Sequence, residues 1–212
     1  MGMKVISVIG LKGGSGKTST AVPLAAEAAR RGPTALLDLD PTPSASQWVD
    51  AAEMTGEHLV TERLDPRDLN STLRQVRRSG AVDFVVIDTP PVARDVCMQA
   101  AGVADLVVLP VHIGSGDLAQ VVQTLDLMEL PRKGNAGLPI VIVLNHAGTM
   151  PALTRDTREA IEGDATAQEF GVRVAETTIP YLKLYAAAKG AKYNPVKMWH
   201  FGKLWNELEA ML

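Results

Sequence analysis

The sequence has little of what several classes of protein require. It holds one cysteine, Cys97, among 212 residues, so an internal disulfide framework and a cysteine-based zinc or iron–sulfur site are both excluded. No apolar run approaches the ~20 residues of a transmembrane helix, and the first residues lead into a strand-like run without a signal peptide. A reducing, cytoplasmic location is therefore the simplest expectation, with Cys97 as a small buried side chain.

Basic residues are not in excess, and aromatic residues are scarce. The formal net charge is −3, so the molecule as a whole is not a polybasic nucleic-acid binder, and any contact with DNA must come from a local basic patch. Aromatic residues make up 4% of the chain and hydrophobic residues 46%, so alanine, valine and leucine must fill the core. This composition suits a parallel sheet covered by alanine-rich helices, and the length suits a single domain over residues 1–212.

Strand-like apolar runs alternate with helical segments along the chain. The alternation predicts a doubly wound α/β fold, in which a mostly parallel sheet is flanked by helices. Right-handed crossovers then bring the loops after the strands to one edge of the sheet. The expected strands are Val5–Ile9, Thr34–Leu39, Phe84–Ile87, Leu106–Val111, Pro139–Leu144 and Val174–Ile179. The expected helices are Ser19–Arg31, Ser44–Ala52, Pro66–Arg78, Asp95–Gly102, Asp117–Met128, Thr154–Glu162 and Lys183–Ala188.

A glycine-rich loop stands between the first expected strand and the first expected helix. Its glycines allow peptide N–H groups to approach an anion, and the N-terminus of the following helix favours negative charge. Lys17 is placed to reach the β- and γ-phosphates of a nucleotide, and the Thr18 hydroxyl suits Mg²⁺. The loop therefore predicts a phosphate-binding site, formed by Gly13, Gly14, Ser15, Gly16, Lys17, Thr18 and Ser19.

Carboxylates end two further apolar runs. Asp38 and Asp40 close the second expected strand, and Pro41 then stops regular structure. A carboxylate at this point can orient a water molecule or hold a water bound to Mg²⁺. Asp88 ends the third expected strand in a Walker B arrangement, which places a carboxylate to hold Mg²⁺. The expected metal-binding residues are therefore Thr18, Asp40 and Asp88.

Later segments supply further candidates. Asn145 ends a strand, where its amide can hydrogen-bond an adenine edge, and Pro180 ends another strand. Acidic residues are absent from positions 182–206. Apolar residues recur with helical spacing from Phe201 to Leu212, which favours an amphipathic helix packed against the sheet or a partner subunit. The lysines of this segment form the best candidate for a patch that contacts the phosphate backbone of DNA; they are Lys183, Lys189, Lys192, Lys197 and Lys203.

The glycine-rich loop departs from the general P-loop pattern, which has glycine where this chain has Leu11. Its residues 12–18, Lys-Gly-Gly-Ser-Gly-Lys-Thr, resemble the deviant Walker A of the ParA/MinD family, which carries a second, signature lysine five residues before the usual one. The Asp-x-Asp-Pro segment, the Walker B carboxylate and Pro180 follow in the order of that family, so the resemblance covers nearly the whole chain. The chain is short and looks most like the small ParA-type partition ATPases of the ParF kind.

The resemblance implies an ATPase that uses ATP with Mg²⁺ and forms a nucleotide-sandwich homodimer. Lys17 would hold the phosphates of its own nucleotide, Lys12 would reach the nucleotide of the partner, and Asp40 would help position the attacking water. Asn145 and Pro180 would hold the adenine. The ATP-bound dimer would bind DNA without sequence preference and so lie on the nucleoid. A centromere-binding or adaptor protein would stimulate hydrolysis, and the cycle would drive DNA segregation or cargo positioning.

Three other interpretations share parts of this pattern. A MinD-like membrane-associated ATPase would need its last helix on anionic lipid, which the acidic residues of that helix disfavour. A reductase of the nitrogenase iron-protein type needs two cluster cysteines per subunit, and this chain has one. A nucleotide-dependent scaffold without significant turnover would keep the fold, whereas the two lysines of the loop and the carboxylates Asp40 and Asp88 favour turnover.

Overall fold

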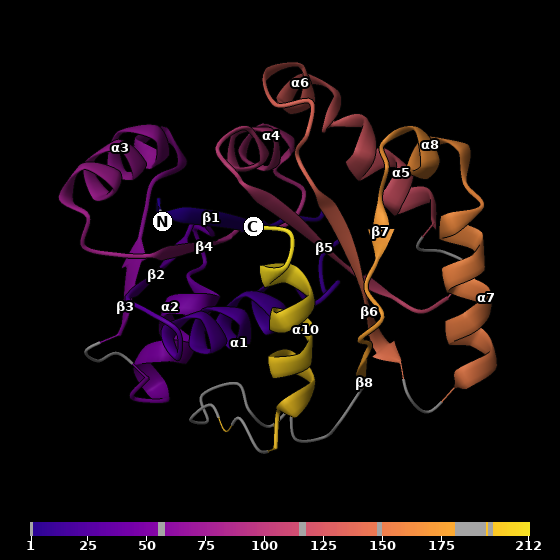
Figure 1. Ribbon diagram of the computed structural model, residues 1–212, viewed down its shortest axis with the longest axis horizontal. Helices are drawn as coiled ribbons and strands as arrows, with labels where there is room; N and C mark the ends of the chain where they lie inside the picture. The colour runs from indigo at the N-terminus through magenta and orange to yellow at the C-terminus, as the bar shows by residue number, and fades with distance from the viewer. Residues whose placement is uncertain (1, 55–57, 115–117, 148–149, 181–193, 195–196) are drawn as a thin grey trace.

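A computed structural model of the chain describes residues 2–54, 58–114, 118–147, 150–180, 194 and 197–212. Its centre is a parallel sheet covered by helices on both faces (Figure 1), which confirms the predicted doubly wound fold. The strand order is β3-β2-β4-β1-β5-β6-β7, with β8 paired to β6. From β1 the chain runs outward to the edge strand β3, then returns through β4 and builds the other half of the sheet from β5 to β7. The strands are β1 (Lys4–Val8), β2 (Thr34–Asp38), β3 (Leu59–Arg63), β4 (Phe84–Asp88), β5 (Leu106–His112), β6 (Ile140–Ala147), β7 (Arg173–Val174) and β8 (Ile179–Pro180).

The helices form two layers, one on each face of the sheet (Figure 1). One core cluster joins the sheet to α1, α2 and α10. The other cluster joins the opposite face to α3, α4, α5, α7 and α8. The helices are α1 (Lys17–Ala29), α2 (Ser44–Ala51), α3 (Leu69–Ser79), α4 (Arg94–Gly102), α5 (Leu118–Asp126), α6 (Glu129–Gly134), α7 (Pro151–Glu162), α8 (Ala165–Glu169) and α10 (Trp199–Glu209), with a 3-10 turn η1 (Pro66–Asp68) before α3.

The structure adds elements that the apolar pattern did not predict. The edge strand β3 contributes one buried side chain, Leu59, and its remaining residues are exposed or half-buried. Such a strand lacks the continuous apolar run of a central parallel strand, because one of its edges and much of its surface face water. The short helices α6 and α8 were also not expected. The single strand predicted over Val174–Ile179 is two short strands, β7 and β8, and the helix predicted over Lys183–Ala188 lies outside the described residues.

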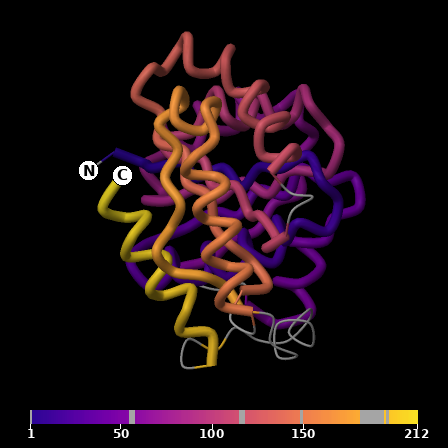
Figure 2. Tube along the Cα trace, turned by 90° about the vertical axis from the view of Figure 1, so that its right-hand side faces the viewer, coloured from indigo at the N-terminus to yellow at the C-terminus, as the bar shows by residue number. Residues whose placement is uncertain are grey.

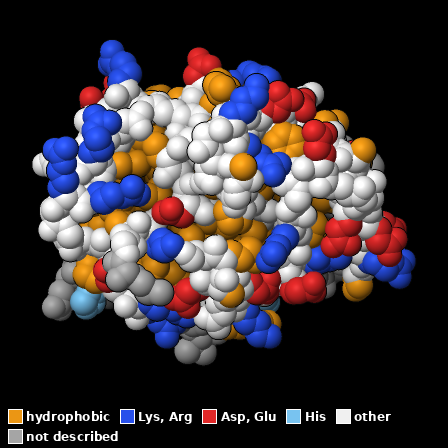
Figure 3. Space-filling model, turned by 45° about the horizontal axis from the view of Figure 1, so that its top comes forward, with side chains coloured by type: hydrophobic (Ala, Val, Ile, Leu, Met, Phe, Trp, Pro, Cys, Tyr) orange, Lys and Arg blue, Asp and Glu red, His pale blue; other side chains and the backbone are white. Residues whose placement is uncertain are grey.

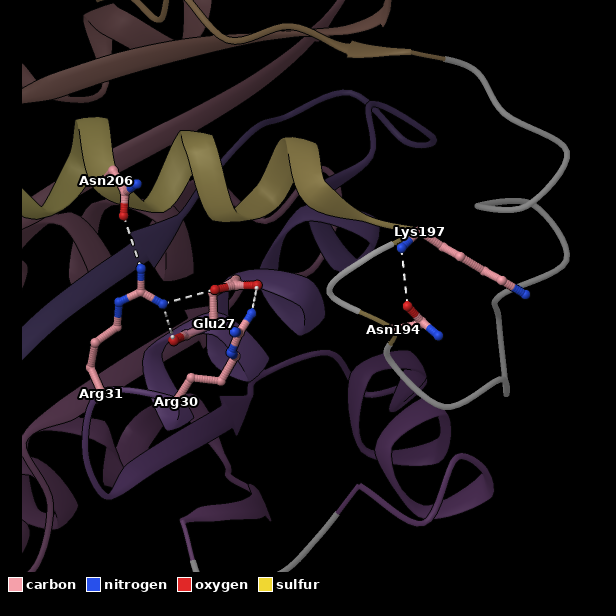
Figure 4. A network of polar contacts seen from close by, with 6 residues as sticks. All are labelled: Glu27, Arg30, Arg31, Asn194, Lys197 and Asn206. Atoms are coloured by element: carbon pink, nitrogen blue, oxygen red, sulfur yellow. Dashed lines mark hydrogen bonds and ion pairs between the residues drawn. The ribbon is translucent and has the colours of Figure 1, made fainter.

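The C-terminal helix α10 packs against α1, through a buried carboxylate. Glu27 of α1 is buried, and it accepts hydrogen bonds from Arg30 at 3.0 Å and from Arg31 at 2.8 Å. Arg31 also donates to Asn206 of α10 at 2.9 Å (Figure 4). A buried carboxylate requires such partners, since an unpaired charge in the core costs several kcal/mol. The contact ties the helix that follows the glycine-rich loop to the C-terminal segment.

The predicted amphipathic helix is confirmed, and its apolar side lies in the core. Phe201, Leu204, Trp205 and Leu208 of α10 are buried. The Trp205 ring meets Phe84 of β4 edge-on, with ring centroids 5.2 Å apart. The two chain ends lie side by side in both views (Figures 1 and 2), where Lys4 donates a hydrogen bond to the carbonyl of Leu212. Among the described residues, no helix has the length and apolarity needed to span a membrane.

Trp205→Ala is expected to lower the free energy of unfolding by about 3–5 kcal/mol, because it removes the largest buried side chain of α10. Trp205→Phe should cost less than about 1.5 kcal/mol, since it keeps an aromatic ring and removes a buried indole N–H that has no described hydrogen-bond partner. Trp199→Ala is the matched control, because Trp199 begins the same helix and is 48% exposed. Urea unfolding of the three variants tests this order, and an equal loss for Trp199→Ala and Trp205→Ala would contradict it.

Candidate nucleotide-binding site

Three neighbouring strands end together at the glycine-rich loop. The pairing aligns Val8 at the end of β1 with Asp88 at the end of β4, and Asp88 with Asp38 at the end of β2. The loop that follows β1 leads directly into α1 at Lys17. A crevice at the carboxyl edge of the sheet, where the strand order reverses, is the usual ligand site of open α/β sheets. The structure thus brings the predicted carboxylates and the predicted phosphate-binding loop to one place.

The glycine-rich loop has a backbone conformation that requires glycine at two of its positions. Gly14 and Gly16 have φ angles of 76° and 95°, a region in which side chains are strained. Lys17 is buried, and its ammonium group donates to the backbone carbonyl of Lys12 at 3.0 Å. Burial lowers the pKa of Lys17, while the nearby Asp88 acts in the opposite direction. The loop therefore holds a lysine ammonium group beside the first turn of α1, whose N–H groups favour an anion.

Two of the three residues predicted to hold Mg²⁺, Thr18 and Asp88, have surroundings that suit that ion. The Thr18 hydroxyl donates to Asp88 Oδ2 at 2.7 Å. The other oxygen, Asp88 Oδ1, is buried and has no hydrogen-bond partner within the described residues. A fully buried carboxylate oxygen without a donor is costly, and a hydrated Mg²⁺ would supply the missing donor through its water shell. Burial, together with the nearby Asp38, raises the pKa of Asp88 to about 7, against the opposing effect of the Thr18 hydrogen bond.

The unfolding of the nucleotide-free protein should depend on pH through Asp88. The folded state keeps the Asp88 proton up to about pH 7, whereas the unfolded chain releases it near 3.8. The contribution of Asp88 to stability therefore falls as the pH rises from about 4 to 7, by up to about 1.4 kcal/mol per pH unit. Asp88→Asn removes this pH-dependent contribution. The free energy of unfolding of the variant, relative to that of the parent, should therefore increase as the pH rises from about 4 to 7. Urea unfolding of both proteins at pH 4.5, 6 and 7.5 without Mg²⁺ checks this. The same dependence of the free energy of unfolding on pH in parent and variant would contradict it.

Asp38 and Asp40 have different surroundings, although one residue separates them. Asp38 is buried and accepts the backbone N–H of Asp40 at 3.1 Å and of Ser46 at 2.9 Å. It therefore shapes the loop between β2 and α2. Asp40 is only half-buried, and its carboxylate accepts the N–H of Thr42 at 2.8 Å. The sequence indicated a role for Asp40 and none for Asp38. The signal that could have indicated the role of Asp38 is its place at the end of a buried strand, two residues before another Asp.

Asn145 and Pro180 come together at the end of the sheet. Their strands are paired, with Asn145 aligned to Ile179 and Ala147 aligned to Pro180. The side chain of Asn145 is buried and its amide nitrogen donates to the Ser15 carbonyl at 3.2 Å. The amide nitrogen is thus bound to the glycine-rich loop, whereas the amide oxygen has no hydrogen-bond partner among the described residues. Asn145 is held against the phosphate loop more closely than its sequence position indicated.

The predicted DNA-binding lysines are described only in part. Lys183, Lys189 and Lys192 lie outside the described residues. The backbone N–H of Lys197 donates to Asn194 Oδ1 at 3.0 Å (Figure 4). The ammonium group of Lys203, on α10, lies 4.6 Å from the ring centroid of Trp199. Lys197 and Lys203 thus flank the start of α10, on the same layer as α1.

Comparison with known proteins places this site in a family. The family model "CobQ/CobB/MinD/ParA nucleotide binding domain" matches residues 6–194. The chain belongs to this family. It is a ParA/MinD-type ATPase, and the expected resemblance is confirmed. A curated relative from Gloeobacter kilaueensis, "Maintenance of carboxysome distribution protein A", is 35% identical over 211 residues, 98% of this chain and 89% of that protein. The protein of the same name from Halothiobacillus neapolitanus is 31% identical over 86% of this chain and 82% of its own length.

Solved structures share the fold. Apo McdA of Cyanothece superposes with a TM-score of 0.76 at 18% identity, covering 99% of both chains. Other ATPases with this fold have been solved with their ligands, among them McdA of Cyanothece with ATP, at a TM-score of 0.74, and MinD of Pyrococcus horikoshii with Mg-ADP, at 0.69. At 14% and 20% identity these likenesses concern the fold alone.

Proposed function

We propose that this protein is a Mg²⁺-dependent cytoplasmic ATPase whose ATP-bound homodimer binds DNA without sequence preference and distributes a cargo along it. The observation that carries the proposal is the Thr18–Asp88 contact beside the buried Lys17, at the start of α1. The whole chain would act as one ATPase domain. The names of the two curated relatives concern carboxysome distribution, which favours a cargo of the carboxysome type over a plasmid.

Each residue of the site has a distinct proposed task. Lys17 binds the β- and γ-phosphates, the backbone of residues 13–16 surrounds them, and Ser19, in the first turn of α1, completes the phosphate-binding segment. Thr18 and Asp88 hold Mg²⁺, which neutralises phosphate charge when bound, and Asp40 orients the attacking water. Asn145 and Pro180 border the adenine.

Lys12 acts across the dimer. It is exposed at the loop surface, where a second subunit can bring its nucleotide. A cation supplied from the partner stabilises the charge of the transition state, as an arginine finger does. An adaptor protein that favours this arrangement would stimulate hydrolysis.

A membrane-bound role of the MinD type is not favoured. The apolar side of α10 is packed between α1 and the sheet, so lipid binding through that helix would expose Trp205 and its buried neighbours. Burial of such side chains is worth about 1.5–3 kcal/mol each.

DNA binding in three nucleotide states tests the proposal. The protein is mixed with either of two unrelated duplexes, with ATP, with ADP or without nucleotide, and each titration is repeated at rising salt. We expect tight binding with ATP alone, equal on both duplexes, with an affinity that falls steeply with salt because the contacts are to phosphates. If the protein dimerises with ATP but binds DNA in none of the three nucleotide states, the proposal that it distributes its cargo along DNA is wrong.

A further inference from the structure

The outer face of α3 is basic and polar. Arg74, Arg77 and Arg78 are exposed and stand at positions i, i+3 and i+4 of the helix, which places them on one side of it. Basic side chains gather at the left of the space-filling view, over α3 (Figure 3). The helix contains no acidic residue. For a protein of net charge −3, this is a local concentration of positive charge.

The arginines are not needed to balance nearby carboxylates. None of the three forms an ion pair with a described residue, whereas Arg67 of η1 pairs with Asp65 at 2.7 Å. Arg77 borders a hollow of about 460 Å³ that also includes Asp83 and Asp105, and makes no ion pair with either. Charges in the last turn can complement the helix dipole. Arg74 lies a turn earlier, beyond the range of that effect.

The rest of the exposed face indicates the kind of partner. Its other residues, Asn70, Ser71, Gln75 and Ser79, carry polar side chains that can donate hydrogen bonds. The apolar side of α3, with Leu69 and Leu73, is buried in the core, and no large hydrophobic side chain of α3 is exposed. Protein–protein interfaces have an apolar centre. An interface of arginine, asparagine, glutamine and serine is typical of contacts to a DNA backbone.

We propose that the outer face of α3 is a second phosphate-backbone surface, which binds double-stranded DNA. It is separate from the lysines at the start of α10, because α3 and α10 cover opposite faces of the sheet (Figure 1). The inference rests on the proposed function and adds to it a second DNA contact, on the helix layer opposite to α1 and α10. A surface on α3 needs no dimer, so it also gives weak binding at low salt without nucleotide.

The test compares Arg74→Gln/Arg77→Gln/Arg78→Gln with a control of equal charge, Lys133→Gln/Arg155→Gln/Arg173→Gln, whose three positions are exposed elsewhere. With ATP, the α3 variant should bind a duplex at least tenfold more weakly than the parent, and its slope of log K against log salt should be shallower by about 2–3. It should also lose the nucleotide-independent binding at 50 mM salt. Lysine at the three positions should restore most of the affinity, since the charge is retained. Thermal unfolding and ATP hydrolysis without DNA should match the parent.

The outcomes separate this inference from the proposed function. If the parent binds no duplex with ATP, both are wrong. If the parent binds and the α3 variant behaves like its control, the surface on α3 is wrong and the proposed function stands. A loss of affinity equal in the α3 variant and in the control would show an effect of net charge alone, and would likewise overturn the surface.

Discussion

Replacing Lys12 with alanine is expected to lower ATP hydrolysis about 1,000-fold, while each subunit still binds ATP. Within its own subunit Lys12 contributes its backbone carbonyl, which accepts the Lys17 ammonium group at 3.0 Å. Alanine keeps that carbonyl, so the hold on Lys17 should survive. What the variant lacks is the exposed ammonium group that we propose reaches the nucleotide of the partner, and ATP-dependent dimerisation should be lost with it.

Two further lysine variants make this prediction specific. Lys17→Ala should lose ATP binding itself, because that side chain is buried in the loop. Lys133→Ala, at an exposed position of α6, should change neither property. Equilibrium ATP binding, sedimentation with ATP and a steady-state hydrolysis assay give the three readouts. If Lys12→Ala dimerises and hydrolyses ATP at parental levels, the proposed role of Lys12 at the nucleotide of the partner subunit is wrong.

Gly16→Ala is expected to weaken ATP binding at least 100-fold and to destabilise the nucleotide-free protein. The φ angle of Gly16 is 95°, and an added Cβ would lie 2.4 Å from the amide nitrogen of Asn145. Either the peptide groups of residues 13–16 must leave the geometry that we propose binds phosphates, or Asn145 must move and lose its hydrogen bond to the Ser15 carbonyl of the loop.

Gly14→Ala is the matched control for this prediction. Its φ of 76° carries a similar backbone strain, of about 1–2 kcal/mol, but its added Cβ meets no heavy atom within 4 Å. In thermal unfolding without nucleotide, Gly16→Ala should therefore lose more stability than Gly14→Ala. Adding Asn145→Ala to Gly16→Ala should recover part of the difference, since it removes the contact. Equal losses in the two glycine variants would show that packing against Asn145 is unimportant.

Much of the fold followed from local patterns. The central strands are buried on both faces, so β1, β4 and β5 appear as largely apolar runs, and β4 ends at the carboxylate Asp88. The edge strand β3 was not predicted, because water reaches it and its sequence is polar. The helices α6 and α8 are 6 and 5 residues long, too short for a periodic apolar pattern to be recognised.

The proposed site combines residues that sequence can predict with residues that it cannot. Gly14, Gly16, Lys17 and Thr18 could be predicted from sequence, because a phosphate-binding turn and its helix are built from consecutive residues. Asp88 could be assigned by its place after an apolar strand. The task of Asp38, which holds the Asp40 and Ser46 amides, depends on how the loop folds back, and no local pattern specifies that.

The sequence by itself determined the alternation of the central strands with the longer helices, the glycine-rich loop and the family, since each rests on neighbouring residues whose spacing sets their conformation. Only the tertiary structure decided which distant groups meet. It placed the Asn145 amide against Ser15, 130 positions away along the chain, and it buried α10 beside Glu27. It also left the arginines of α3 exposed on the opposite layer. Such contacts depend on strand order and layer packing, which join residues far apart in the chain and leave no periodic signal in the sequence.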